Sequence, residues 1–239
     1  MSAADASPTV AGVVVIIPAL NEEVRISATV GSAQRLANVC HVIVADDGST
    51  DSTAELASAA GAQVVRHDRR RGKAAAMTTG AAAAREAGYG EYPLLFLDAD
   101  LEASAANAGP LIAPVIKGAA DMTIAVLPPA VGGGGRGFVM RLAASGIEQA
   151  TGWRPTAPLS GQRCITRGLF DSVLPLAPGF GVETGLTIDA LRHGAKVKEC
   201  PADLGHRVTG TSFRDQRHRA RQYRDVWRAL AARRVIRFR

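Results

Sequence analysis

The sequence has few cysteines, few aromatic residues and no long apolar run. Its three cysteines, Cys40, Cys164 and Cys200, are scattered and odd in number, which argues against a disulfide framework or a cysteine-based metal site. Aromatic residues make up only 5% of the chain, so we expect an aliphatic core. No apolar run has the length of a membrane-spanning helix, and the first nine residues lack a signal-peptide pattern. We therefore expect a cytoplasmic protein with reduced thiols.

Internal repeats and long linkers are also missing. The 239 residues are enough for a sizeable core. We expect one domain over residues 1–212, with a first half at about 12–127 and a second half at about 128–212. A basic helix follows over residues 213–239.

The positive charge is concentrated in that last segment. The net charge is +6, but residues 214–239 carry ten arginines against two aspartates, or +8, which leaves −2 for the rest. A nucleic-acid binder should carry basic residues along a face of its fold. Nucleic acid is therefore not the expected partner.

Strand and helix signals alternate along the first hundred residues. The expected strands are residues 12–17, 41–45, 63–66, 93–97, 122–127 and 196–199, and the expected helices are 22–37, 52–60, 73–87, 138–149, 183–192 and 213 onward. Such alternation predicts right-handed βαβ units. The fold class is therefore α/β, with a mostly parallel central sheet flanked by helices.

One predicted strand ends on two carboxylates, Asp98 and Asp100. Ligands of parallel sheets bind at the carboxyl ends of the strands, and residues i and i+2 of an extended chain point the same way. Such a pair suits a hard divalent cation shared with substrate phosphates. The alternative is a pair of turn or N-cap aspartates.

Two other strand ends carry polar turns. The first continues as Pro18-Ala19-Leu20-Asn21-Glu22-Glu23, and Pro18 ends the ladder because it has no N–H. The second continues as Asp46-Asp47-Gly48-Ser49-Thr50-Asp51, which is not the glycine fingerprint of a dinucleotide fold. Its acidic pair suits hydrogen bonds to a nucleobase or ribose, and both segments also suit ordinary strand-to-helix turns.

A basic segment, Arg69-Arg70-Arg71-Gly72-Lys73, opens the third predicted helix. Four cations in five positions at a helix start suit a diphosphate. The alternative is a solvated basic loop.

These four motifs, in this order, resemble those of family 2-type glycosyltransferases with the GT-A (Rossmann-like) fold. The resemblance implies a nucleoside-diphosphate-sugar donor and Mg²⁺ or Mn²⁺ at the Asp98-Ala99-Asp100 motif. The first half would then bind the nucleotide and the second half the acceptor. Sugar transfer to a small, anionic or phosphorylated acceptor is the expected reaction.

Motifs of the second half resemble glucosyl-3-phosphoglycerate synthases. They are Gly132 to Arg136, Pro158 to Gln162, Ala177 to Leu186 and Gly205-His206-Arg207. The residues implied to bind the nucleotide are Pro18, Ala19, Leu20, Glu22, Asp47 and Lys73, and we expect Asp46, Asp98 and Ala99 to contact the donor as well. The expected catalytic residues are Lys73, Asp98, Asp100 and Glu183, and the metal ligands implied by the resemblance are Asp100 and His206. The expected acceptor residues are Gly135, Arg136, Ser160, Gly161, Gln162 and Arg163.

Two positions depart from that family. Phe138 and Val208 occupy places where the family uses a threonine and an asparagine toward the acceptor phosphate, and neither side chain can hydrogen-bond a phosphate. Phosphoglycerate is therefore not assigned as the acceptor. Retention of anomeric configuration is favoured by the resemblance. Inversion, with Glu183 as the base, is the alternative.

The last helix leaves its role open. Tyr223, Val226, Trp227 and Leu230 share one face among arginines. Such a face packs on its own domain, on a partner in a homodimer, or on an anionic membrane, where a polyprenyl phosphate would be the acceptor. Two further alternatives are a sugar-phosphate nucleotidyltransferase and a non-catalytic nucleotide- or RNA-binding module.

Overall fold

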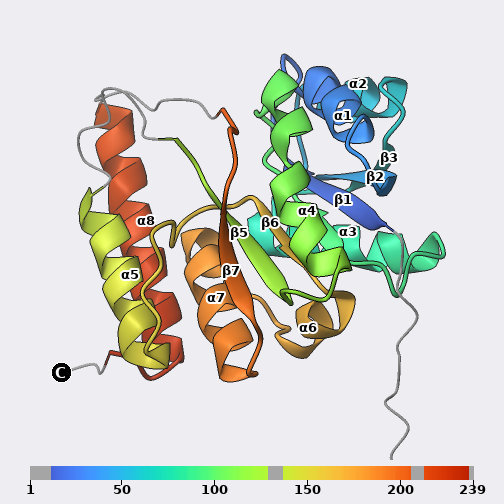
Figure 1. Cartoon of the computed structure of the whole chain (residues 1–239). Helices are drawn as coiled ribbons and strands as arrows, with labels where there is room; N and C mark the ends of the chain where they lie inside the picture. The colour runs from blue at the N-terminus through green and yellow to red at the C-terminus, as the bar shows by residue number, and fades with distance from the viewer. Residues whose placement is uncertain (1–11, 129–136, 206–212, 237–239) are drawn as a thin grey trace, which may run out of the picture.

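The computed structural model describes residues 12–128, 137–205 and 213–236. Seven described strands form one sheet in the order β3-β2-β1-β4-β6-β5-β7 (Figure 1). They are β1 (Val13–Ala19), β2 (Val39–Asp46), β3 (Gln63–Arg66), β4 (Leu94–Phe96), β5 (Met122–Val126), β6 (Arg163–Ile165) and β7 (Val197–Pro201). Among them, β6 runs antiparallel to β4 and β5, while the other pairs are parallel. The predicted mostly parallel sheet is confirmed.

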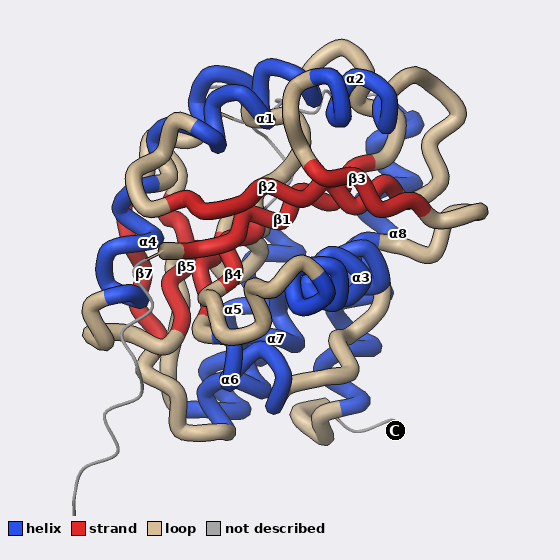
Figure 2. The backbone as a smooth tube through the Cα atoms, turned by 90° about the vertical axis from the view of Figure 1, so that its right-hand side faces the viewer, coloured by secondary structure: helices blue, strands red, loops and turns tan. Residues whose placement is uncertain are grey.

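Helices cover both faces of this sheet (Figure 2). They are α1 (Ile26–Gln34), α2 (Thr53–Ala59), α3 (Lys73–Glu86), α4 (Gly109–Ile116), α5 (Gly137–Thr151), α6 (Arg167–Ser172), α7 (Val182–Arg192) and α8 (Phe213–Ala232), with short 3₁₀ turns η1 (Glu102–Asn107) and η2 (Gly179–Gly181). One face packs on α1, α2 and α4, and the other on α3, α6 and α7.

The central strand β1 shows how the apolar residues divide between the two layers. Val13, Val15 and Ile17 belong to the core under α1, α2 and α4. Val14 and Ile16 belong to the core under α3, α6 and α7. Because successive strand side chains point to opposite faces, a strand buried on both sides must be apolar throughout.

Some predicted boundaries were wrong, and some elements were missed. The first helix begins at Ile26 instead of residue 22, and the N–H groups of Glu22 and Glu23 bond to the side chains of Thr53 and Asp51. The three-residue strand β6 and the helices α4 and α6 were not predicted. β6 is too short for a periodic signal, and Pro114 lies inside α4.

A third layer lies outside α7, where α5 and α8 run side by side (Figure 1). Val226 and Leu230 of α8 are buried against Ile147 of α5 and Ile188 of α7. Much of the apolar face predicted for this helix therefore packs on the protein itself. No described helix is long and apolar enough to cross a membrane.

Truncating the core of β1 should destabilise the fold strongly. Ile16 is fully buried, whereas Val24 is 82% exposed. We expect Ile16→Ala to lower the free energy of unfolding by about 2–5 kcal/mol, measured by urea denaturation. Val24→Ala is the matched control and should change it by less than about 0.5 kcal/mol. Equal effects of the two substitutions would contradict the assignment of the core.

Candidate active site at the carboxyl edge of the sheet

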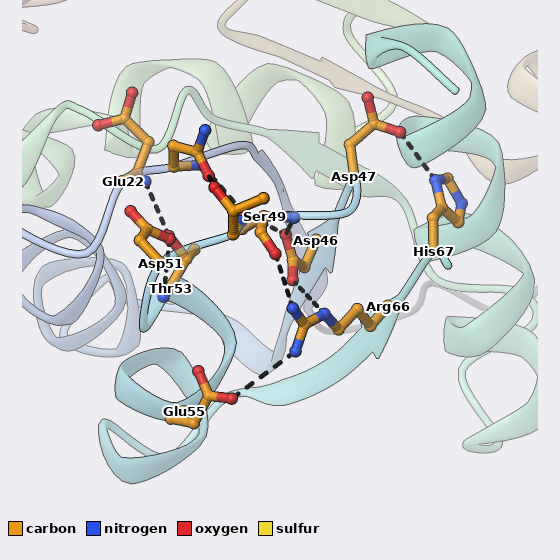
Figure 3. Close-up of polar contacts among 11 residues, drawn as sticks. Glu22, Asp46, Asp47, Ser49, Asp51, Thr53, Glu55, Arg66 and His67 are labelled. Atoms are coloured by element: carbon orange, nitrogen blue, oxygen red, sulfur yellow. Dashed lines mark hydrogen bonds and ion pairs between the residues drawn. The ribbon is translucent and has the colours of Figure 1, made fainter. Parts of the chain in front are cut away.

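The turns after β1 and β2 are bound to each other (Figure 3). The N–H of Asn21 donates to Ser49 Oγ (2.9 Å), and the N–H of Thr50 donates to Asn21 Oδ1 (2.9 Å). Asn21 has a positive φ of 56°, a conformation that asparagine tolerates better than most residues. The predicted donor-binding segment after β1, residues 18–22, is therefore held by the turn after β2.

Asp51 extends this contact to the first turn of α2. It accepts hydrogen bonds from Glu23 N (3.2 Å) and from Thr53 N (3.1 Å), while Thr53 Oγ1 accepts one from Glu22 N (2.8 Å). Slight burial acts to raise the pKa of Asp51, but the hydrogen bonds from Thr53 and Glu23 bring it below its ordinary value. Glu22, one of the predicted donor residues, also pairs with Arg25 at 3.2 Å.

Asp46 is buried and holds its own turn. Its Oδ1 accepts hydrogen bonds from the N–H and hydroxyl of Ser49, and its Oδ2 pairs with Arg66 Nε at 3.1 Å. Gly48 in this turn has φ 80°, and a β-carbon there would lie 2.8 Å from the carbonyl carbon of Arg69. The turn after β2 thus touches the basic segment directly.

Asp47 ties that basic segment down. Its Oδ1 accepts from Arg71 N and its Oδ2 from Gly72 N, both at 2.7 Å. His67 Nδ1 lies 2.9 Å from Oδ1, and its Nε2 lies 2.9 Å from Thr79 Oγ1. Asp47 was predicted to bind the nucleotide; the contacts seen give it the further task of fixing the start of α3.

Lys73, the first residue of α3, joins three elements. Its Nζ donates to Asp98 Oδ1 (2.7 Å) after β4 and to Glu183 Oε1 (3.0 Å) in the first turn of α7. Burial alone would lower the pKa of Lys73, but the charges of Asp98 and Glu183 raise it above its ordinary value. Three of the four predicted catalytic residues therefore meet around one cation.

The Asp98-Ala99-Asp100 turn is anchored from α1. The hydroxyl of the buried Thr29 donates to the carbonyl of Ala99 (2.7 Å) and accepts from Glu102 N (2.8 Å). Two carboxylates at one turn fit a hard cation such as Mg²⁺ or Mn²⁺. In the described part of the chain no three metal-ligating side chains gather. The predicted third ligand, His206, lies outside the described residues.

The loop before β6, residues 156–162, contacts Asp98 and Lys73. Gln162 Nε2 donates to Asp98 Oδ2 (2.6 Å), and Ser160 Oγ donates to Gln162 Oε1 (3.2 Å). A β-carbon at Gly161 would lie 2.5 Å from Lys73 Nζ, so any side chain there would displace the lysine. Ser160, Gly161 and Gln162, predicted to contact the acceptor, lie beside the cluster of Lys73, Asp98 and Glu183.

Arg163, predicted to bind an anionic group of the acceptor, is buried, and its guanidinium is bonded within the protein. It donates to the carbonyl of Ser160 (2.8 Å), to Thr187 Oγ1 (2.8 Å) and to the carbonyl of Pro158 (3.5 Å). Burial lowers its pKa to about 10, although the charges of Glu183 and Glu199 oppose this. These contacts brace the loop against α7.

Glu199 of β7 holds the other end of this loop. Its carboxylate accepts from Ala157 N (2.7 Å), Thr156 N (2.8 Å) and the Thr156 hydroxyl (2.7 Å). The loop 156–162 is therefore clamped at both ends. Two predicted acceptor residues, Gly135 and Arg136, lie outside the described residues, as does Val208.

Several residues that shape the site were missed in the sequence. They are Thr29, His67, Glu199 and Asn21. Each acts on a segment at least 20 positions away, and no local pattern marks such a pairing. Only Asn21, in a turn after a predicted strand, carried a signal, since asparagine is frequent where φ is positive.

With this sheet order and these strand ends, the molecule is a GT-A fold protein. Solved structures of the same fold agree. One is a glucosyl-3-phosphoglycerate synthase from Mycobacterium tuberculosis in complex with phosphoglyceric acid, with a TM-score of 0.77 and 29% identity over 93% of this chain and 79% of that one. Another structure of that enzyme, with Mn²⁺, UDP-glucose and phosphoglyceric acid, has a TM-score of 0.75 and 30% identity over 95% of this chain and 81% of that one.

The chain belongs to glycosyl transferase family 2, whose model matches residues 14–170. Among curated proteins, the glucosyl-3-phosphoglycerate synthase of Mycobacterium tuberculosis (strain ATCC 25618 / H37Rv) is 34% identical over 79% of this chain. The match covers 63% of that relative, so the chain spans less than two thirds of its length. The predicted resemblance, in family and in fold, is confirmed.

Removing the Arg163 clamp should loosen the loop without unfolding the sheet. In Arg163→Met the carbonyls of Ser160 and Pro158 lose their donor, and we expect amide hydrogen exchange over residues 156–162 to rise about ten-fold. A ten-fold increase in the exchange rate is expected when local opening of the loop becomes easier by about 1.4 kcal/mol. Arg167→Met is the control, because Arg167 is also buried but bonds to Asp171 and to the carbonyl of Ala81. Unchanged exchange over the loop in Arg163→Met would exclude the clamp.

The contribution of Lys73 to the free energy of unfolding should not depend on pH near neutrality. A lysine whose pKa is raised on folding contributes stability that is present in full below the unfolded-state value and is lost as pH rises through the folded value. The difference in unfolding free energy between wild type and Lys73→Met should therefore stay constant from pH 7 to about 9.5 and shrink only above about pH 10.5. A difference that vanishes between pH 7 and 9 would refute this.

Proposed function

We propose that the chain transfers a hexose from a nucleoside-diphosphate sugar, with UDP-glucose the first candidate, to a small phosphorylated acceptor, with retention and with Mg²⁺ or Mn²⁺. The observation that carries the proposal is the cluster of Lys73, Asp98 and Glu183 at the carboxyl edge of the sheet. Two supports are the membership of glycosyl transferase family 2 and the similarity to synthase structures that hold Mn²⁺, UDP-glucose and phosphoglyceric acid.

The donor would lie across the turns that follow β1, β2 and β4. Residues 18–20 and Glu22 would contact the base and ribose, on a segment held by the turn after β2. Asp46 and Asp47 would keep that turn and the basic segment in place. Lys73 and the neighbouring arginines would then face the diphosphate, where fixed cations stabilise the charge that develops on the leaving group.

Asp100, with His206, would hold the divalent ion. When bound, such an ion neutralises the charge of the departing diphosphate. The carboxylate of Asp98, oriented by Lys73 and Gln162, would face the donor sugar with Ala99. Glu183, held by the same lysine, would orient sugar hydroxyl groups.

The acceptor would approach over the clamped loop. Ser160, Gly161 and Gln162 lie beside Asp98 and Lys73, so an acceptor seated on them would meet the donor sugar. Arg163 would act from beneath by bracing the loop. Gly135 and Arg136 remain proposed contacts for the anionic group of the acceptor.

The polyprenyl-phosphate alternative depended on the apolar face of α8. Val226 and Leu230 of that face are buried on α5 and α7, so these side chains cannot enter a membrane without leaving the core. A small, water-soluble acceptor is therefore the proposal favoured by the packing.

A transfer assay with matched acceptors tests the proposal. Purified protein comprising residues 1–239 is incubated with UDP-glucose, Mn²⁺ and either 3-phosphoglycerate, glycerol 3-phosphate, glycerate or glycerol. We expect UDP release and a glucosylated product, seen by mass spectrometry, with the phosphorylated acceptors only. NMR should show an α-linked product, which is retention from this donor.

Other outcomes would overturn parts of this scheme. A β-linked product would exclude retention. Transfer only to a polyprenyl phosphate in anionic vesicles would favour the membrane alternative. Release of pyrophosphate would indicate a nucleotidyltransferase, and salt-dependent RNA binding without turnover would indicate a binding module.

A further inference from the structure

The C-terminal helix α8 lies against a row of glycines. A β-carbon at Gly146 of α5 would lie 2.5 Å from Leu230 Cδ2, and one at Gly181 of η2 would lie 2.6 Å from the carbonyl oxygen of Asp225. At Gly185 of α7 a β-carbon would lie 2.8 Å from the guanidinium of Arg233. Close approach of backbone to a neighbour requires glycine. The observed packing of α8 and Arg233 therefore requires glycine at positions 146, 181 and 185.

Asp225 makes a polar contact between α8 and η2. Its Oδ2 accepts a hydrogen bond from the N–H of Phe180 at 3.3 Å. A β-carbon at Gly179, which has φ 63°, would lie 2.3 Å from the same oxygen. The carboxylate thus occupies the space that a side chain at Gly179 would otherwise fill, whereas a side chain at Gly181 would meet the backbone of Asp225 and the side chain of Ala229.

The segment that Asp225 holds leads directly into the catalytic cluster. η2 ends at Gly181 and α7 begins at Val182. Glu183 follows, and its Oε1 lies 3.0 Å from Lys73 Nζ. Only two residues separate Phe180 from Glu183, so the position of the η2 backbone sets where the Glu183 carboxylate lies.

A second contact fixes the other end of α7 to the same helix. Arg233, just after α8, donates through Nε to Asp189 Oδ1 (2.8 Å) and pairs with Asp189 Oδ2 through Nη2. Arg192 donates to the carbonyl of Arg233 (3.0 Å). Helix α7 is therefore attached to α8 near its start, through η2, and to the residue that follows α8 near its end.

We infer that α8 is part of the catalytic framework and that Asp225 is a positioning residue for Glu183. This inference rests on the proposed function. It assigns to the arginine-rich helix a role other than binding a membrane, a nucleic acid or a second copy of the chain. Asp225 touches no proposed substrate group, and it acts through η2 alone.

Three variants and one control test the inference. Asp225→Ala removes the acceptor of the Phe180 N–H, whereas Asp225→Asn retains an acceptor oxygen. Gly181→Ala adds the β-carbon that meets α8, and it strains nothing else because Gly181 has φ −87°. Gly168→Ala is the matched control, since a β-carbon at Gly168 has nothing within 4 Å.

Measuring kcat and the Kd for UDP in the same variants distinguishes a positioning role of Asp225 from a general loss of stability. For Asp225→Ala and Gly181→Ala we expect kcat for glucose transfer to fall about ten-fold, the effect of about 1.4 kcal/mol on the barrier. The Kd for UDP with Mn²⁺ should stay within about two-fold, because the turns after β1 and β2 are untouched. Asp225→Asn should recover most of the rate, and Gly168→Ala should match wild type. In a partly unfolded variant, the fraction of protein that binds UDP and the rate of transfer would instead fall together.

A second measurement keeps the test valid if the transfer proposal itself fails. Amide hydrogen exchange over residues 179–186 should rise in Asp225→Ala and in Gly181→Ala, and not in Gly168→Ala. If wild type transfers glucose and both variants keep its kcat, the positioning role is wrong. If wild type transfers nothing, the proposed function fails, and unchanged exchange over 179–186 in both variants would separately overturn the contact.

Discussion

The structure of the site depends on the two hydrogen bonds that Lys73 Nζ makes to Asp98 and Glu183. The three residues come from α3, the turn after β4 and α7, so one ammonium group fixes the relative positions of both halves of the molecule. Two carboxylates this close would repel each other without a cation between them. The remaining contacts of the site hold these three groups, or the turns around them, in place.

The segments that carry Lys73 and Asp98 are held in place by residues that do not contact Lys73 themselves. Asp47 binds the backbone just before Lys73, and Thr29 anchors the turn that carries Asp98. Arg163 and Glu199 clamp the loop whose Gln162 reaches Asp98. Because polar groups fixed before the reaction need no reorganisation during it, such support favours catalysis of charge-separating steps.

The features of this fold that can be predicted from the sequence are those that a short segment determines by itself. The buried strands, the acidic turn after β4 and the basic start of α3 follow from apolar runs and from the residues that end them. The antiparallel β6 was missed because three residues carry no periodicity. The buried state of Arg163 and the clamp by Glu199 depend on contacts between β6, β7 and the loop. A pairing across 42 or more positions, such as that of Glu199 with Ala157, leaves no mark in either segment.

The central claim, that the Lys73 cluster is the donor site, is tested most directly by calorimetric titration of UDP in the presence of Mg²⁺. Wild type and Lys73→Met are compared, with circular dichroism to show that both are folded. We expect the Kd for UDP to rise at least about ten-fold in Lys73→Met, because a charge-assisted contact to phosphate is lost. Equal UDP affinity in the two folded proteins would contradict it.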